Sequence, residues 1–150
     1  MRTFPRAEIQ ETLDRFVAAN RLAEQDGDWG RLADFYTDDA VYVYAGLAAG
    51  GMVEARGRDA IRQLVLARDM EDYRGWTFPH EWAVIEGNRI VTKWQNRGPG
   101  TRPDGTYYEA PGISVIEYAG GGKFDSQWDL FDRLSVKAVK DQSEAARRSR

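Results

Sequence analysis

The chain has 150 residues, about the length of one domain, and its 21 Lys and Arg against 24 Asp and Glu give a net charge of −3 at pH 7, which argues against a nucleic-acid-binding protein. Cysteine is absent and His80 is the only histidine, which excludes disulfides, thiolate metal sites and histidine clusters, so we expect neither a metal nor a cofactor. The sequence has no apolar run of the roughly 20 residues that span a bilayer and no signal peptide at its start, so we expect a cytoplasmic protein with no membrane partner.

The N-terminal half is predicted to be mainly helical. Ile9, Leu13 and Phe16 recur at helical spacing, and Asn20 continues this apolar stripe, so that a polar group faces the interior. The expected elements are, in chain order, a helix over residues 6 to 25, a short helix after Asp28, a strand over 41 to 45, a glycine-rich loop over 46 to 57 that is a plausible lid, and a helix over 59 to 71.

The C-terminal half changes to a period of two, which is typical of strands. Short connections between successive strands indicate antiparallel neighbours. Strands are expected over residues 77 to 86, 89 to 97, 107 to 118 and 123 to 133. From residue 138 the chain is polar and charged, which predicts a frayed helix or a disordered tail. We therefore predict one α+β domain over residues 1–135, a curved antiparallel or mixed sheet wrapped around N-terminal helices, followed by a polar tail over 136–150.

The two faces of the strand over residues 107 to 118 differ in side-chain size. One face carries Tyr108 and then the small residues Ala110, Gly112 and Ser114. Small side chains on the concave side of a bent sheet leave volume unfilled, which favours a ligand pocket over a packed core. The aromatic residues, 12% of the chain, are numerous enough to line such a pocket as well as to fill a core.

The opposite sheet face carries large apolar residues. Ile113 and Val115 lie on it, as do Trp128 and Leu130 of the last strand. An apolar face of this kind needs a partner, so we predict a homodimer that packs through the convex face of the sheet.

Several short motifs in order along residues 8 to 135 resemble one known superfamily. They are Gln25-Asp26-Gly27-Asp28-Trp29, Phe35-Tyr36-Thr37-Asp38-Asp39-Ala40-Val41-Tyr42, Gly57-Arg58-Asp59-Ala60-Ile61, Gly122-Lys123-Phe124 and Trp128-Asp129-Leu130-Phe131-Asp132. The chain resembles the nuclear-transport-factor-2-like superfamily, and within it the branch of SnoaL-like polyketide cyclases and limonene-epoxide hydrolases. The resemblance implies a cystatin-like α+β roll, a fold that hosts isomerases, cyclases, lyases, hydrolases and non-enzymes.

The resemblance also allows catalytic positions to be compared. The positions that match the catalytic tyrosine and two aspartates of ketosteroid isomerases are Phe16, Tyr44 and Pro111, so that chemistry is not implied. Compared with the limonene-type epoxide hydrolases, the chain keeps an aspartate at position 129 and a tyrosine at position 42. It has Trp94 and Asn96 where those enzymes have an arginine and its partner aspartate.

Asp129 is the best candidate for a general acid or base. An apolar surrounding should raise the pKa of its carboxyl group towards the range useful for proton transfer. We expect Tyr42 and Asn96 to act with Asp129 in catalysis. The residues expected to contact the substrate are Asn20, Tyr44, His80, Trp94, Tyr108, Gln127 and Phe131.

Two functions remain open from the sequence. The first is a cofactor-independent lyase, isomerase, cyclase or hydrolase that performs acid/base chemistry on a hydrophobic cyclic or aromatic small molecule. The alternative is a non-catalytic module for small-molecule binding or dimerisation, in which Asp129 is a structural polar group.

Overall fold

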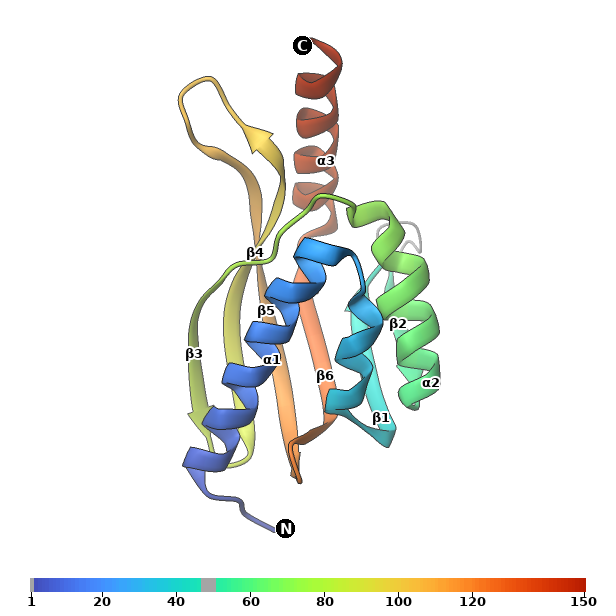
Figure 1. Ribbon diagram of the computed structural model, residues 1–150, viewed down its shortest axis with the longest axis vertical. Helices are drawn as coiled ribbons and strands as arrows, with labels where there is room; N and C mark the ends of the chain where they lie inside the picture. Colours follow the sequence, from blue (N-terminus) through green and yellow to red (C-terminus); the bar gives the residue numbers. More distant parts are fainter. Residues whose placement is uncertain (1, 47–50) are drawn as a thin grey trace.

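The computed structural model describes residues 2–46 and 51–150 of the chain. Helical elements come first, strands dominate the second half, and one helix closes the chain (Figure 1). In chain order the elements are α1 (Arg6–Asp26), η1 (Trp29–Phe35), β1 (Tyr36–Ala45), β2 (Met52–Arg56), α2 (Arg58–Ala60), η2 (Ile61–Arg68), η3 (Asp69–Tyr73), β3 (His80–Glu86), β4 (Arg89–Thr101), β5 (Tyr107–Gly120), β6 (Lys123–Phe131) and α3 (Arg133–Arg148).

The strands form one six-stranded sheet in the order β2-β1-β6-β5-β4-β3. The strands from β3 to β6 pair as antiparallel neighbours, as predicted, and β2 is antiparallel to β1. The pairing of β1 with β6 is parallel, which makes the sheet mixed. The N-terminal helices lie across one face of this curved, open sheet (Figure 1). The predicted single α+β domain is confirmed.

The apolar stripe of α1 packs into the core between the helices and the sheet. Ile9, Leu13 and Phe16 are buried as predicted, and so is Asn20. The ring of Phe16 meets those of Phe35 and Phe124 edge-on, each at a centroid distance of 5.3 Å. Contacts of this kind favour a defined ring geometry beyond simple burial, and they hold α1 to η1 and to the start of β6.

The predicted loop over residues 46 to 57 is partly wrong. Its second part forms β2, which pairs with β1 from Val41 opposite Arg56 to Ala45 opposite Met52. The strand is short and its flanks are glycine-rich, so its period of two gives little signal in the sequence. Residues 47–50 lie outside the described residues, and with them the part of the loop that was expected to act as a lid. The predicted strand over 41 to 45 begins earlier, at Tyr36.

The C-terminal segment is a packed helix, so the expectation of a frayed or disordered polar tail is wrong. Val136, Val139 and Ser143 of α3 are buried at helical spacing. The Ser143 hydroxyl donates a hydrogen bond to the Pro99 carbonyl at 2.7 Å, which ties α3 to β4. The Asp132 side chain accepts the Leu134 N–H and caps the helix. β6 therefore ends at Phe131 rather than at residue 133.

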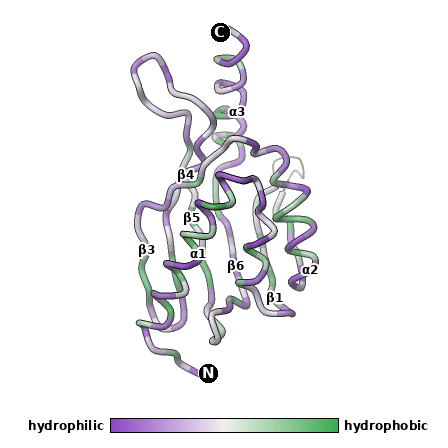
Figure 2. Tube along the Cα trace, in the orientation of Figure 1, coloured by the Kyte–Doolittle hydropathy of each residue, from purple (hydrophilic) through white to green (hydrophobic). Residues whose placement is uncertain are grey.

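Most residues of α3 are hydrophilic, although the helix has a packed face (Figure 2). Its apolar residues occupy only one narrow stripe among charged neighbours, which is why the segment looks like a tail in the sequence. None of the helices in the described part of the chain is both long enough and apolar enough to cross a membrane.

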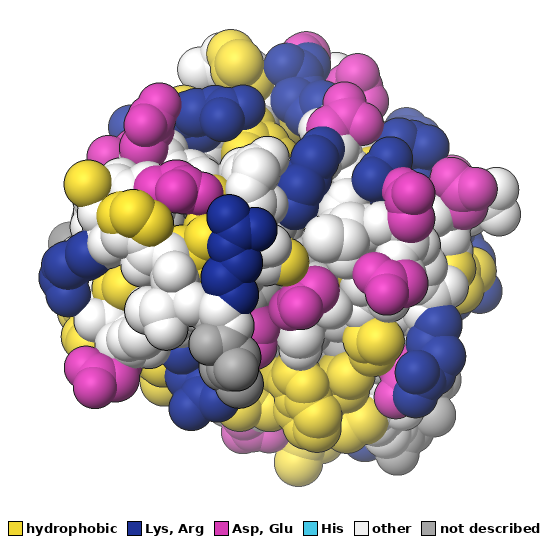
Figure 3. Space-filling view, turned by 90° about the horizontal axis from the view of Figure 1, so that it is seen from below, with side chains coloured by type: hydrophobic (Ala, Val, Ile, Leu, Met, Phe, Trp, Pro, Cys, Tyr) yellow, Lys and Arg dark blue, Asp and Glu magenta, His cyan; other side chains and the backbone are white. Residues whose placement is uncertain are grey.

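The sheet face away from the N-terminal helices carries a continuous apolar row. Val84 lies opposite Val91, Val91 opposite Val115, and Val115 opposite Trp128, so the row runs from β3 to β6. Trp128 is 47% exposed and its neighbour Leu130 is 44% exposed. Figure 3 shows exposed hydrophobic side chains gathered at the lower edge of the view from below. We call this row, with Trp128 and Leu130, the outer apolar face.

Candidate functional site

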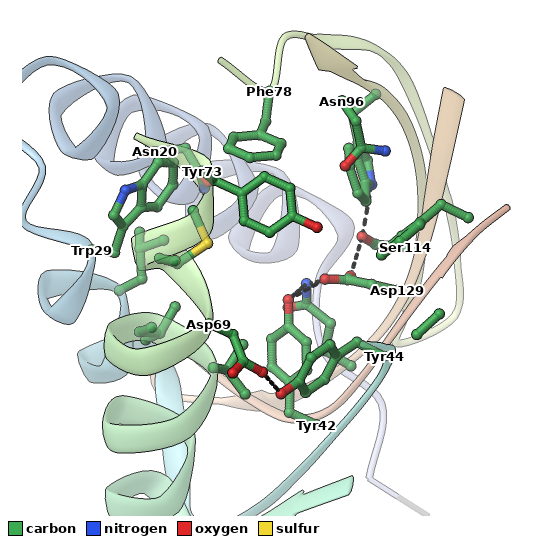
Figure 4. A pocket seen from close by; sticks show the side chains of 18 of the residues that line it. Asn20, Trp29, Tyr42, Tyr44, Asp69, Tyr73, Phe78, Asn96, Ser114 and Asp129 are labelled. Carbon is green, nitrogen blue, oxygen red and sulfur yellow. Dashed lines mark hydrogen bonds between the residues drawn. The ribbon is translucent and has the colours of Figure 1, made fainter. Parts of the chain in front are cut away.

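A cavity of about 380 Å³ lies between the N-terminal helices and the sheet. Aromatic and aliphatic side chains make up most of its wall, and its polar groups come both from the strands and from the helical segments (Figure 4). Cavities of this size and character hold small organic molecules in other proteins. The apolar part of the wall includes Phe16, Trp29, Leu32, Val65, Leu66, Met70, Phe78, Trp94 and Phe131.

Asp129 lies at the polar end of this cavity, where β1, β5 and β6 run side by side. The sheet register places it opposite Tyr44 of β1 and Ser114 of β5. The Tyr42 hydroxyl donates a hydrogen bond to Asp129 Oδ2. Asp129 Oδ1 accepts from the Ser114 hydroxyl at 2.6 Å and from Gln127 Nε2 at 2.9 Å. Burial raises the pKa of Asp129, as expected from the sequence, and these three hydrogen bonds act in the opposite direction.

A second set of hydrogen bonds orients the groups that hold Asp129. Trp94 Nε1 donates to the Ser114 hydroxyl at 2.9 Å. The Tyr36 hydroxyl donates to Gln127 Oε1 at 2.6 Å, while Gln127 Nε2 donates to the Tyr42 hydroxyl at 3.0 Å. The network is therefore continuous from Tyr36 to Trp94. Burial, together with the Asp129 charge, raises the pKa of both Tyr36 and Tyr42, so both remain protonated donors at neutral pH.

Sequence reasoning missed Tyr36. Side chains two residues apart in a strand lie on the same face, and residue 36 is an even number of residues from Tyr42 and Tyr44. A strand extended back to residue 36 would therefore have placed Tyr36 on the inner face. The register of β1 against β6 shifts between Tyr36 and Val41, and the chain keeps Tyr36 buried across this irregularity.

The cavity also borders η3, which overlaps the end of the helix predicted over residues 59 to 71. The Tyr44 hydroxyl donates to Asp69 of η3, and Arg68 Nε donates to the same carboxylate at 2.9 Å. The bond between Tyr44 and Asp69 joins β1 to η3 beside the cavity (Figure 4). The sequence gives no signal for Asp69 or for Tyr73 at the end of η3, because the helical pattern predicts only an apolar side facing the sheet.

The remaining polar side chains of the wall come from α1, β3 and β4. Asn20 Nδ2 donates to the Phe16 carbonyl at 2.9 Å, and His80 Nδ1 lies 3.0 Å from the Thr92 hydroxyl. Burial lowers the pKa of His80 to about 4, with a smaller contribution from the Arg21 charge, so its ring is neutral at neutral pH.

The structure brings most of the predicted site residues to the cavity. Their catalytic and binding roles stay predictions. The predicted residues that line it are Asn20, Tyr42, Tyr44, His80, Trp94, Asn96, Gln127, Asp129 and Phe131.

Tyr108 is the predicted site residue that the cavity wall does not include. It packs with Ala110 beneath Val136 and Val139 of α3. Gly112 does not open volume either, because a Cβ there would lie 2.6 Å from the Trp94 ring. The expected wall of small residues is therefore wrong for positions 110 and 112, where α3 and an indole fill the space.

The acidic side chains of the described residues are not gathered as metal ligands are. Across residues 2–46 and 51–150, no group of three or more His, Asp or Glu side chains is placed to hold a metal ion. The groups near Asp129 are hydroxyls and an amide, which suit hydrogen bonding to an organic molecule.

The sequence and the fold both resemble those of known proteins. A family model for the SnoaL-like domain matches residues 13–125. The chain belongs to the SnoaL-like domain family. A search of curated proteins found none that matches this SnoaL-like protein.

Solved structures share the fold of this SnoaL-like protein at low sequence identity. A candidate SnoaL-like polyketide cyclase from Jannaschia sp. CCS1 has 17% identity and a TM-score of 0.66, with 89% of this chain and 91% of that chain covered. TerC, co-crystallised with polyporic acid, has 16% identity and a TM-score of 0.64, with 87% and 98% covered. A protein with a ketosteroid isomerase-like fold from Catenulispora acidiphila DSM 44928, in complex with trimethylamine, has 20% identity and a TM-score of 0.64, with 84% and 92% covered.

Proposed function

We propose that this SnoaL-like protein is a cofactor-independent enzyme that uses Asp129 to transfer a proton on a hydrophobic cyclic or aromatic small molecule. The observation that carries the proposal is the position of the Asp129 carboxylate at the polar end of a cavity of about 380 Å³ with a mainly apolar wall. Proton transfer of this kind begins isomerisation, cyclisation, elimination and hydration reactions alike, so the site is compatible with a lyase, an isomerase or a hydrolase.

The chemistry of the proposed step rests on the surroundings of Asp129. Burial raises the pKa of the carboxyl group, which makes the carboxylate a stronger base than an exposed aspartate. The hydrogen bonds from Tyr42, Ser114 and Gln127 hold both oxygens in fixed positions. A base that is already oriented needs little reorganisation when a substrate C–H or O–H group approaches.

Two of the similar structures support a ligand site in this fold. TerC was crystallised with polyporic acid and the Catenulispora protein with trimethylamine. Both are small organic molecules, which agrees with a cavity built for a ligand rather than left by imperfect packing.

Proton abstraction can be tested without knowing the natural substrate. We would measure, by NMR in D₂O, the exchange of deuterium into the acidic C–H positions of 2-tetralone, a bicyclic ketone with an aromatic ring. Wild type should accelerate the exchange above the buffer rate. In Asp129→Asn the exchange rate should fall at least about tenfold, because the amide is not a base. Asp125→Asn, on the exposed side of the same strand, is the matched control and should retain the wild-type rate.

The alternative function, a non-catalytic binding module, predicts a different result. The three hydrogen bonds to Asp129 come from the protein itself, which also suits a structural carboxylate. Retention of a ligand through purification, with equal exchange rates for wild type and Asp129→Asn in a folded protein, would support the module and contradict the enzyme.

Two copies of the chain are proposed to pair through the outer apolar face. Trp128 and Leu130 are each exposed by more than two fifths in one copy, and they continue the apolar row of β3 to β5. Burial of such a row against its own copy removes apolar area from water on both sides, and a two-fold arrangement closes after two copies.

A further inference from the structure

Asn96 presents an unpartnered oxygen to the cavity. The residue is only 2% exposed, and its Nδ2 donates to the Ala110 carbonyl at 3.3 Å. Figure 4 shows the amide oxygen pointing into the cavity and the nitrogen pointing away from it. Within the described residues no side chain donates to this oxygen, and it is not sealed from the cavity space. Because the nitrogen is already used by the backbone, Asn96 can offer the cavity an acceptor.

The Tyr73 hydroxyl also points into the cavity (Figure 4). Its ring is held edge-on against Trp76, at a centroid distance of 5.1 Å, and against Phe78 at 5.8 Å. The hydroxyl has no hydrogen-bond partner in the part of the chain that the structure describes. A phenol hydroxyl can donate one hydrogen bond and accept another, so Tyr73 can complement a group that already donates to Asn96.

The groups around Asp129 have no such spare donors. The hydroxyls of Tyr36 and Tyr42 and the Trp94 indole N–H each donate to a protein acceptor. The Ser114 hydroxyl and the Gln127 amide donate to Asp129. A ligand carbonyl would therefore find few free donors on the sheet side of the cavity, whereas a ligand hydroxyl would find a free acceptor in Asn96.

His80 adds a second acceptor to the wall. The Thr92 hydroxyl donates its single proton to the Trp82 carbonyl at 3.2 Å, and in this arrangement it accepts from His80 Nδ1, which lies 3.0 Å away. This assigns the proton of the neutral ring to Nδ1 and leaves Nε2 with a lone pair. His80 is one of the residues that line the cavity, so in this tautomer β3 adds an acceptor to that of Asn96 on β4.

We propose that the cavity selects a ligand that carries a hydroxyl group, a phenol or a cyclic alcohol, whose hydroxyl donates to Asn96 Oδ1 and accepts from the Tyr73 hydroxyl. This inference rests on the proposed function, since it names the substrate class of the same cavity. A buried acceptor that is left without a donor penalises ligands that lack the hydroxyl, and so the site discriminates against them.

The experiment compares three probes that differ only in this group. Isothermal titration calorimetry of the purified full-length protein would measure Kd for 2-naphthol, for 2-methoxynaphthalene, which cannot donate, and for naphthalene. Wild type should bind 2-naphthol about tenfold more tightly than the other two, which corresponds to one or two net hydrogen bonds. Asn96→Leu and Tyr73→Phe should each reduce this preference at least about threefold without weakening naphthalene binding.

Matched variants separate Asn96 and Tyr73 from the other polar groups. Tyr108→Phe makes the same chemical change outside the cavity wall and should keep the preference. If Asn96→Leu fails to fold, Tyr73→Phe still tests the proposal, because it removes only one hydroxyl oxygen, which faces the cavity. If the preference for 2-naphthol disappears only in Asp129→Asn, the proposal is overturned, since Asp129 would then be the group that binds the ligand hydroxyl.

The remaining outcomes distinguish this inference from the proposed function. Equal affinity of wild type for all three probes overturns the hydroxyl selection and leaves the acid/base proposal standing. Tight, hydroxyl-selective binding without any deuterium exchange supports the hydroxyl selection and contradicts the enzyme. If none of the probes binds, the selected ligand class is overturned, and the deuterium exchange tests the acid/base proposal independently.

Discussion

The hydroxyl of Tyr36 donates to Gln127 Oε1 at 2.6 Å, and this bond turns the Gln127 nitrogen towards Asp129 and Tyr42. If the amide were reversed, its oxygen would face the Asp129 carboxylate, and two acceptors would repel each other. Tyr36 touches neither the carboxylate nor its proton, so it acts as a positioning residue through Gln127.

Replacement of Tyr36 by phenylalanine tests this relationship. Tyr36→Phe removes the bond that fixes the Gln127 amide, so the hydrogen bond from Gln127 that lowers the pKa of Asp129 becomes weaker. We expect the acid limb of the pH profile of deuterium exchange to move to higher pH, and the free energy of unfolding to fall by about 1 kcal/mol.

The control for Tyr36 is Tyr118, whose buried hydroxyl donates to Glu8 Oε1 at 2.6 Å far from the cavity. Tyr118→Phe should cost similar stability and leave the pH profile unchanged. Equal pH profiles for wild type and Tyr36→Phe would show that Tyr36 is merely a core residue.

The buried carboxyl of Asp129 should make the stability of the protein depend on pH. Burial raises its pKa in the folded state, so the folded protein retains this proton at a pH where the unfolded chain has released it. The contribution to stability is therefore full below the unfolded pKa of about 4 and is lost as the pH rises. We expect Asp129→Asn to gain stability relative to wild type between about pH 4 and about pH 7. Urea unfolding at both pH values measures this gain. If the free energies of unfolding of Asp129→Asn and wild type differ by the same amount at both pH values, the expectation is contradicted.

His80 offers a direct measurement, because it is the only histidine in the chain. Burial lowers its pKa to about 4, so its ring signals should titrate with a midpoint near that value in NMR spectra of the folded protein. The unfolded chain in urea should titrate near the ordinary value of about 6.5. The stability linked to His80 is thus present above the unfolded pKa and is lost as the pH falls towards 4. A folded-state midpoint above about 6 would show that the ring is exposed and charged more easily.

Gly112 lies directly under the Trp94 ring. A Cβ at this position would meet Trp94 ring carbons at 2.6 to 2.8 Å, so Gly112→Ala must push the indole towards the cavity. We expect a loss of about 1 to 3 kcal/mol in the free energy of unfolding and weaker binding of naphthalene. Gly51→Ala is the control, because its Cβ would meet nothing within 4 Å. Unchanged stability and binding in Gly112→Ala would mean that the ring can move elsewhere.

The outer apolar face can be tested by its oligomeric state. Trp128→Glu places a charge in the centre of the proposed interface, and we expect sedimentation velocity to show a monomer where wild type is a dimer. Leu134→Glu is the control, because Leu134 is 77% exposed at the start of α3 and lies off this face. A wild-type chain that sediments as a monomer, or a Trp128→Glu variant that remains a dimer, would refute pairing through this face.

The sequence by itself determined the class of fold and much of the cavity wall. The helical spacing of Ile9, Leu13 and Phe16 and the alternation in the last four strands are local signals, because side chains repeat with the period of their own element. The alternation also placed Asp129 and Trp94 on the inner face before any tertiary contact was known.

Only the tertiary structure decided which of these inward residues meet at one site. Tyr36 and Gln127 are 91 positions apart in the chain, and their hydrogen bond depends on the parallel pairing of β1 with β6. Tyr108 also lies on the inner side of the sheet, but α3 covers it. The short apolar stripe of α3, with Val136 and Val139, packs against Tyr108 and separates it from the cavity. The orientation of the Asn96 amide depends on a backbone carbonyl of the neighbouring strand. These features depend on contacts between distant parts of the chain, and such contacts leave no periodic signal in the sequence.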